Sequence, residues 1–171
     1  MTPKSAPKLG ILLVGGLLGT PAMTVVMYMF APVLGIHTDI VALLGEVLGG
    51  WKMGMLVHIL NGAIIFPAIF AFLLFRHLPG PPVVKGIEFG LLLWLTSQAL
   101  VMPLMGAGFF SAHIGGFKAV AAALLGHLVY GGFLGSACLV QSLAQEDSTA
   151  RTLLGAVPLN PNAVRSAPKM R

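Results

Sequence analysis

The sequence has few charged side chains, and acidic ones are the scarcest. Only 9% of its 171 residues are charged and five are acidic, whereas about a quarter of an ordinary soluble domain is charged. Hydrophobic residues make up 57% of the chain, and its mean hydropathy is +0.93. So little polar surface cannot cover a short chain in water, which excludes an ordinary soluble domain and indicates an integral membrane protein. The formal net charge of +5 therefore gives no reason to expect a nucleic-acid partner.

The sequence also lacks paired cysteines and the motifs of common enzymes. Its single cysteine, Cys138, lies in an apolar run, so it can form no internal disulfide and is expected to be a small packing residue. The chain contains no HExxH zinc motif, no Walker lysine, no CxxC pair and no serine–histidine–acid set. We therefore expect a protein that is not an enzyme.

Four apolar segments are long enough to cross a bilayer, which takes about 20 residues. They cover approximately residues 9–34, 53–75, 83–105 and 117–143. Each run is continuous rather than alternating, so we expect α-helices, which satisfy their own backbone hydrogen bonds, and not the strands of a β-barrel. The run after Lys8 is too long for a signal peptide and is expected to remain as the first span.

The basic residues indicate how the spans are oriented, because Lys and Arg gather on the cytoplasmic side of membrane proteins. Eight lie at the N-terminus, between the second and third spans or in the tail, and two lie beside the starts of the second and fourth spans. In that order they are Lys4, Lys8, Arg76, Lys85, Arg151, Arg165, Lys169 and Arg171, and Lys52 and Lys118. We therefore expect a multi-pass protein of the bacterial inner membrane with both termini in the cytoplasm.

Two segments outside the spans also have an expected structure. Residues 37–48 (HTDIVALLGEVL) begin with Thr38 and Asp39, which suit a helix N-cap, and then become apolar. This segment is too short to cross, so we expect a short interfacial or re-entrant helix in the first outer loop. Residues 144–171 are polar and basic, and we expect them to form a cytoplasmic tail that contacts a partner protein or anionic lipid headgroups.

The four spans carry an internal repeat. GGWK (49–52) opens the second span and GGFK (115–118) opens the fourth, and HILNG (58–62) and HLVYG (127–131) follow them. The first and third spans each have an early GxxxG. A duplicated two-helix hairpin with both halves inserted in the same direction accounts for this pattern. The expected fold is therefore an all-α four-helix bundle built from two parallel two-helix repeats.

Small residues on these helices predict close contacts between backbones, because helices in lipid associate through packing rather than through a hydrophobic force. This role involves no catalysis and no bound ligand. The candidates are Gly15, Gly19, Gly62, Gly86, Gly90, Gly131 and Gly135.

The histidines of the two repeated motifs are the main candidates for a functional site, because an ionisable group inside a membrane is costly to solvate. His58 lies six residues after Lys52, and His127 lies nine after Lys118. We therefore expect both in the outer half of the membrane, with His127 about one turn deeper.

Four interpretations of the polar residues stay open. One is hydrogen bonding between helices, in which the histidines join a polar seam. This polar seam would also contain Asn61, Gln98, Tyr130 and Tyr28. A second interpretation is axial ligation of a b-type haem by His58 and His127.

The third interpretation is a metal site at the outer face, and the fourth is a transport path. Residue types suit the metal site, but their spacing matches no compact motif. Transport has little support, since Glu88 is the one acid near a span and a surface pair with Lys85 accounts for it. The nine methionines could indicate copper handling or simply fill the core. The metal-site candidates are His37, Asp39, Glu46 and His113.

Several stretches of the chain together resemble a family of small bacterial four-helix membrane proteins of unknown function. They are GLLGTPAMTVVMYMFAPVLGI, TDIVALLGEVLGG and GHLVYGGFLG, and the match covers about residues 10–140. The resemblance implies the four-span topology and an association with larger membrane systems, respiratory ones included, but no particular chemistry. The positions that carry it are Thr24, Met27, Asp39, His58, Gly62, His127 and Gly131.

We therefore expect a non-catalytic accessory or structural subunit of a larger bacterial membrane complex, most plausibly a respiratory or electron-transfer one. Its partners would be other membrane-protein subunits and bound phospholipids. The alternative is a small subunit with b-type haem or a quinone site that uses His58 and His127, and a transporter of small solutes or ions comes third.

Overall fold

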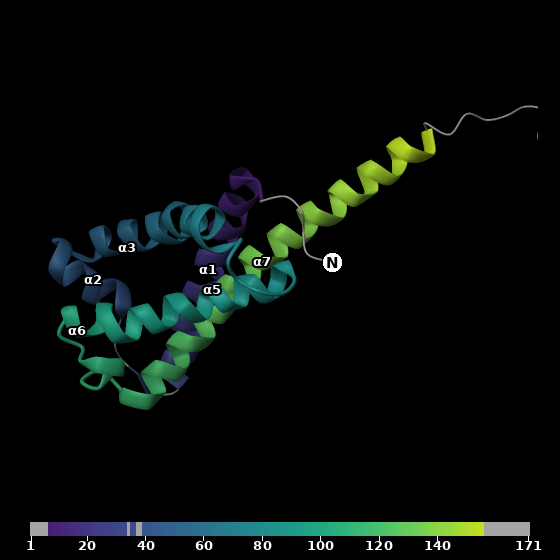
Figure 1. The fold of residues 1–171 in the computed structure, drawn as a ribbon. Coiled ribbons are helices and arrows are strands. Elements are labelled where there is room, and N and C mark those ends of the chain that lie inside the picture. The colour runs from purple at the N-terminus through teal and green to yellow at the C-terminus, as the bar shows by residue number, and fades with distance from the viewer. Residues whose placement is uncertain (1–6, 34, 37–38, 156–171) are drawn as a thin grey trace, which may run out of the picture.

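The computed structural model describes residues 7–33, 35–36 and 39–155, and this part of the chain is helical without a strand (Figure 1). Four of its helices are long and apolar enough to cross a membrane. The all-α class and the four apolar segments expected from the sequence are therefore confirmed. These helices cover Leu9–Met29, Trp51–Leu74, Pro82–Leu104 and Gly116–Leu154.

The first and last long helices are continuous α-helices, whereas the middle two contain wider π turns. The first is α1 (Leu9–Val33), and the last is α7 (Gly116–Gly155). The second consists of α3, η1, α4 and η2: Trp51–Leu60, Asn61–Ile65, Phe66–Ile69 and Phe70–Leu74. The third consists of α5, η3 and α6: Pro82–Thr96, Ser97–Val101 and Met102–Leu104.

Two of the π turns stand directly before prolines. In η1 the N–H of Phe66 donates to the carbonyl of Asn61, five residues back, and Pro67 follows. Pro103 follows η3 at the same spacing. A proline has no N–H, and its ring collides with the carbonyl four residues earlier in an α-helix. The wider turn lets each long helix continue past its proline.

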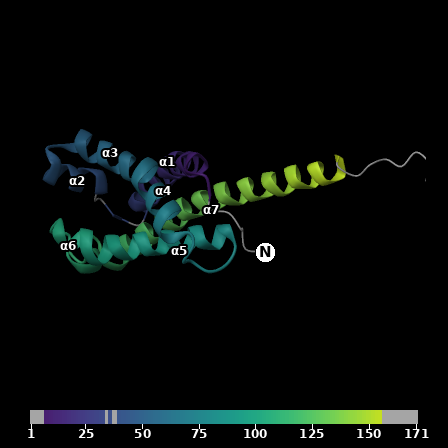
Figure 2. The ribbon, with the colours of Figure 1, turned by 45° about the horizontal axis from the view of Figure 1, so that its top comes forward.

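α7 is the central helix and packs along both α1 and α5 (Figure 2). Gly15 and Gly19 of α1 lie against it, and a Cβ added at Gly19 would come 3.1 Å from the ring of Tyr130. On the other side, a Cβ added at Gly86 of α5 would collide with the carbonyl of Gly131. Both GxxxG pairs therefore pack on the same helix. The relation between the two hairpins as copies of one repeat stays a prediction from the sequence.

The buried core lies toward the end of the bundle that holds Leu9, which we call the N-terminal end. Phe70 and Phe89 stack there with their ring centroids 5.0 Å apart. Cys138 is buried in the same cluster, in the packing role expected for it. The buried members of this core are Leu12, Phe70, Ala71, Phe75, Phe89, Tyr130, Leu134 and Cys138.

Lys85 is buried at the N-terminal end and is only 7% exposed. Its ammonium donates to the carbonyl of Phe75 at 2.8 Å and stands 4.5 Å from the centre of the Phe75 ring. Phe75 directly follows η2, so Lys85 caps the second long helix from α5. The expected surface pair with Glu88 is therefore wrong. Glu88 Oε2 is instead buried, without a hydrogen bond among the described residues.

The opposite end of the bundle, which we call the α2 end, carries the short helix α2 (Ile40–Leu48). Gly49 and Gly50, with φ of 96° and 126°, turn the chain from α2 back into α3. α2 then packs against the start of α3, where a Cβ added at Gly54 would collide with the carbonyl of Val41. The segment expected to be a short helix is thus helical, and it is held against α3.

α7 continues well past the rest of the bundle at the N-terminal end (Figure 1). The N–H of Lys8 donates to Oε1 of Gln141 at 2.8 Å, and this bond marks the level where α1 begins beside α7. The sequence places the end of the fourth span near residue 143, but the helix runs on to Gly155. We call residues 142–155 the stalk. The rest of the expected tail, residues 156–171, lies outside the described residues.

Candidate functional site

His58 and His127 lie at the same level of the bundle. Helix α1 contacts both of the helices that carry them, and these contacts give the level of each histidine. On one side Thr24 reaches His58, with 2.9 Å between Oγ1 and Nε2. On the other side the Cγ atom of Met23 is 3.2 Å from the place of a Cβ on Gly126, the residue before His127. Met23 and Thr24 are neighbours, so a common level replaces the expected one-turn difference in depth. We call Met23, Thr24, His58 and His127 the histidine layer.

A buried hydrogen bond toward the N-terminal end joins the same helices. Tyr130 donates its hydroxyl hydrogen to the carbonyl of Gly62 at 2.6 Å. In the register of η1, the donor expected for this carbonyl is Pro67, which has no N–H. The π turn and the proline therefore leave an acceptor that Tyr130 of α7 satisfies, and Thr20 of α1 packs directly on Gly62.

The hydrogen bonds of Thr24 fix which nitrogen of His58 carries its proton. The Thr24 hydroxyl donates to the carbonyl of Thr20 at 2.8 Å. A hydroxyl has one hydrogen, so Thr24 must accept from His58 Nε2–H. Neutral His58 then has a lone pair on Nδ1.

His127 has the opposite tautomer. Its Nδ1 lies 2.7 Å from the carbonyl of Ala123, one turn back in α7. A carbonyl only accepts, so Nδ1 carries the hydrogen, and neutral His127 has its lone pair on Nε2.

The two imidazoles therefore each have one anchored nitrogen and one further nitrogen that finds no hydrogen-bond partner in the described part of the chain. The layer is thus a pair of oriented nitrogen bases inside an apolar bundle.

The other residues expected in the polar seam make separate contacts. Gln98 accepts a hydrogen bond from Ser111 at 2.8 Å, and both side chains are buried. Tyr28 donates to Asp39 at the α2 end. The Asn61 side chain makes no hydrogen bond within the described residues. A set of local contacts therefore stands in place of one continuous seam.

Asp39 is the centre of a structural contact at the α2 end. It accepts from Tyr28 of α1 at 2.7 Å and from Trp51 Nε1 of α3 at 2.9 Å. It also caps α2 by accepting from the N–H groups of Val41 and Ala42 at 2.8 and 3.1 Å. Partial burial opposes ionisation, but these hydrogen bonds outweigh it and lower the pKa of the Asp39 carboxyl. This residue therefore ties three helices together.

The described residues do not assemble the metal site expected at the outer face. No three His, Cys, Asp or Glu side chains come together there in a way that could hold a metal ion. His113 is exposed, and its Nδ1 contacts the carbonyl of Gly106 at 3.0 Å. Glu46 is also exposed, and His37 and Thr38 lie outside the described residues.

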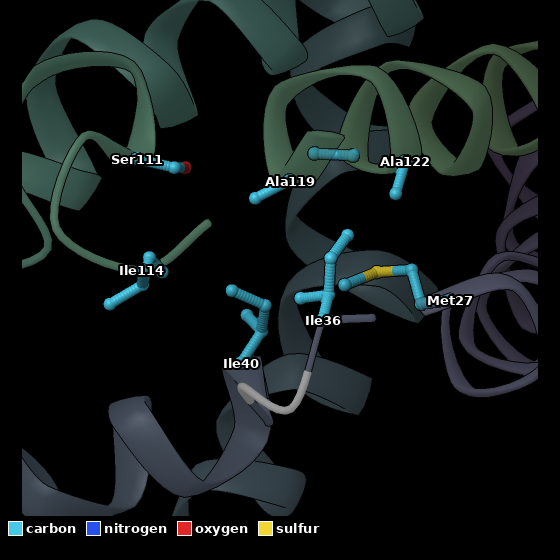
Figure 3. Close-up of a pocket in the computed structure, with 8 residues that line it drawn as sticks. Met27, Ile36, Ile40, Ser111, Ile114, Ala119 and Ala122 are labelled. Carbon is cyan, nitrogen blue, oxygen red and sulfur yellow. The ribbon is translucent and has the colours of Figure 1, made fainter. Parts of the chain in front are cut away.

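A small cavity opens at the α2 end between the two halves of the bundle (Figure 3). Its volume is ≈ 30 Å³, which is room for a water molecule but far less than a porphyrin or a quinone ring needs. The lining is apolar except for Ser111, whose hydroxyl is bonded to Gln98. The lining residues are Met27, Ile36, Ile40, Ser111, Ile114, Ala119, Ala122 and Ala123.

These observations define an all-helical protein with four helices that are long and apolar enough to cross a membrane. The chain belongs to a family of unknown function, DUF6789, whose model matches residues 8–150. This confirms the resemblance to a family without an assigned activity. No curated protein and no solved structure matches the chain, so evidence on function comes from its own residues.

Proposed function

We propose that this protein is a non-catalytic accessory subunit of a larger membrane complex, namely a respiratory or electron-transfer complex of the bacterial inner membrane. Its four long helices cross the membrane, and the N-terminal end and the stalk face the cytoplasm. The charge distribution supports this orientation, because four of the six Lys and Arg residues in the described part of the chain lie at the N-terminal end or on the stalk. They are Lys8, Arg76, Lys85 and Arg151.

The stalk is the observation that carries the proposal. From Gln141 to Gly155, α7 continues for about 20 Å at the usual rise per residue, beyond the level where Lys8 joins it. An isolated helix of this length is only marginally stable in water. Here the stalk is the continuation of a packed helix, so it projects as a formed surface suited to a partner.

The tip of the stalk is apolar as well as exposed. Leu153 and Leu154 are 65% and 75% exposed, although they lie beyond the part of α7 that would contact lipid. Paired apolar side chains on an otherwise polar helix are a typical contact for another protein. The basic residues 156–171 follow in the sequence and supply charge for anionic headgroups or an acidic partner surface.

The experiment is purification of the full chain from its native membrane in a mild detergent, followed by native electrophoresis and mass spectrometry. We expect it in an assembly with defined membrane subunits. The double variant Leu153→Ser, Leu154→Ser should leave the assembly while it stays in the membrane. Ser148→Ala, on the same stalk, is the matched control and should remain bound. If the wild-type chain migrates alone, or if both variants behave like it, the proposal fails.

The alternative of a b-type cytochrome rests on the common level of His58 and His127. Against it, the Nε2 atom of His58 is already bonded to Thr24, so this nitrogen could ligate iron only after that bond breaks. A reduced-minus-oxidised visible spectrum of the gently purified protein separates the two cases, since a haem α-band that His58→Ala abolishes would favour the cytochrome.

A further inference from the structure

Glu88 of α5 holds the one buried side-chain oxygen or nitrogen in the described part of the chain that has no hydrogen-bond partner. This atom is Oε2 of its carboxyl group. The ion pair found among the described residues joins Arg151 to Asp147 on the stalk, so no cation is paired with Glu88 there. A buried polar atom without a partner costs free energy, and such atoms often mark a bound group or a proton-transfer role.

The nearest cation along α5 is bound elsewhere. Lys85 lies three residues before Glu88, which is close enough for the two side chains to meet on a helix surface. Its ammonium instead donates to the carbonyl of Phe75 at 2.8 Å and lies 4.5 Å from the centre of the Phe75 ring. Both contacts direct the charge of Lys85 toward the end of the second long helix, and the carboxyl of Glu88 stays without a partner.

The outer surface of α5 around Glu88 is apolar. Its other neighbours on the same side of the helix, three or four residues away, are Val84, Leu91 and Leu92. These side chains are 41–45% exposed, and they face lipid when the third long helix crosses a membrane. Glu88 follows Pro82, where this apolar segment begins, by about 9 Å along the helix. Its carboxyl group therefore lies within the hydrocarbon region and not at the water interface.

The helices that pack against α5 bring no opposite charge to this level. Between Lys118 and Glu146, α7 has no Lys, Arg, Asp or Glu, and the second long helix has none between Lys52 and Arg76. Arg76 and the neighbouring His77 are exposed in the turn that precedes α5. Nothing on these helices therefore compensates a negative charge at Glu88.

His127 is the titratable residue of α7 closest to this level, because its carbonyl packs against Gly90. Gly90 is two residues from Glu88, however, so the two residues lie on different sides of α5. The described residues also contain no group of three His, Cys, Asp or Glu side chains that could hold a metal ion. A carboxylate ion in such surroundings is costly, and a buried acid becomes neutral by binding a proton instead.

We propose that Glu88 is a proton-binding site inside the membrane, with its carboxyl group protonated at the lipid-facing surface of α5. A proton is the ligand that fits, because Oε2 is buried within this chain and a larger group cannot reach it. Glu88 as a whole is half-buried, so a reagent dissolved in lipid can reach the rest of its side chain. This inference rests on the proposed crossing of the membrane by the long helices, but not on the stalk or on a partner complex.

The test uses dicyclohexylcarbodiimide, a lipid-soluble reagent that adds to protonated carboxyl groups, on the full-length protein in membrane vesicles. The carboxyl proton moves to a nitrogen of the reagent, and a carboxyl oxygen bonds to its central carbon. The adduct then rearranges to a stable N-acylurea, and no group leaves. We expect a single label per chain, which peptide mass spectrometry places on Glu88. Glu88→Gln should lose the label, whereas Glu88→Asp keeps an acid and should retain it.

Matched controls separate this site from general reactivity of carboxyl groups. Glu46→Gln removes an exposed carboxyl from α2, and Glu146→Gln removes one from the stalk. Both variants should be labelled on Glu88 to the same extent as the wild type. Labelling of Glu46 or Glu146 in place of Glu88, or no labelling of the wild type, would overturn the proposal.

Infrared spectroscopy of the unlabelled protein in detergent at neutral pH gives a second measurement that needs no reagent. The wild type should show the C=O stretching band of a protonated carboxylic acid, which shifts in heavy water. Glu88→Gln should lack this band and Glu46→Gln should keep it. Because glutamine has the shape of the neutral acid, Glu88→Gln should also melt at the wild-type temperature. Absence of the band from the wild type would show that Glu88 is ionised and would contradict the site.

Neither measurement depends on whether the chain is purified within a larger assembly. A chain that migrates alone but carries the label and the band would refute the accessory role and leave the proton site standing. A chain that stays in an assembly without the label and the band would do the opposite.

Discussion

Asp39 shows how one side chain fixes the α2 end. It holds Tyr28 and Trp51 and caps α2, and these bonds lower its pKa from the ordinary value of 3.8. A carboxyl with a lowered pKa stabilises the folded state above its unfolded pKa, and this contribution disappears as the pH falls through the folded pKa. We therefore expect the attachment of α2 to weaken below about pH 4.

Hydrogen exchange followed by mass spectrometry measures this effect on the α2 segment. Exchange at Val41 and Ala42 should become faster as the pH falls from 5 to 3, after correction for intrinsic rates. Asp39→Asn keeps a helix-capping residue but cannot ionise, so its exchange in α2 should not vary with pH in this range. An unchanged pH dependence in this variant would show that another group is responsible.

At the residue scale, the sequence indicated the candidates but not their partners. His58 and His127 stand out because a polar ring in an apolar span is unusual. Met23 does not stand out, since methionine is ordinary in such helices. Thr24 stands out only as a position of the family resemblance, and its contact with His58 becomes visible only in the packing of α1. Lys85 was misjudged because its spacing from Glu88 predicts a pair on the helix surface, whereas the nearby Phe75 carbonyl provides a buried partner.

At the scale of the helices, glycines determine how closely two backbones can pack. The contact between α5 and α7 is the clearest case. Gly86→Ala should destabilise the bundle by about 1–3 kcal/mol, the usual cost of overpacking, because the new methyl group meets the carbonyl of Gly131. Gly132→Ala is the matched control, since a Cβ there meets nothing within 4 Å. The control should be neutral or more stable, as alanine favours helix. Thermal unfolding in detergent compares the two, and equal melting temperatures would contradict the packing.

The long helices were predictable from continuous apolar runs of sufficient length, but their internal geometry was not. Pro67 and Pro103 predict an interruption of the regular α-helical hydrogen bonds. The sequence does not tell whether this interruption is a kink or a π turn. The outcome depends on a distant side chain, because Tyr130 satisfies the carbonyl that the η1 turn frees. The extension of α7 was not predicted either, because the residues after Leu143 are polar and their composition is typical of an unpacked tail.

At the scale of the whole molecule, the proposed orientation puts the α2 end outside and the stalk in the cytoplasm, because four of the six described Lys and Arg residues lie at the N-terminal end or on the stalk. The only native cysteine, Cys138, is 2% exposed, so the wild-type chain should react little with a membrane-impermeant maleimide. Lys118→Cys should then be labelled from outside in intact cells with a permeabilised outer membrane. Ser148→Cys, on the stalk, should be labelled only after the inner membrane is broken. The reverse pattern would show that the protein has the opposite orientation. Labelling of both variants in intact cells would show that α7 does not cross the inner membrane.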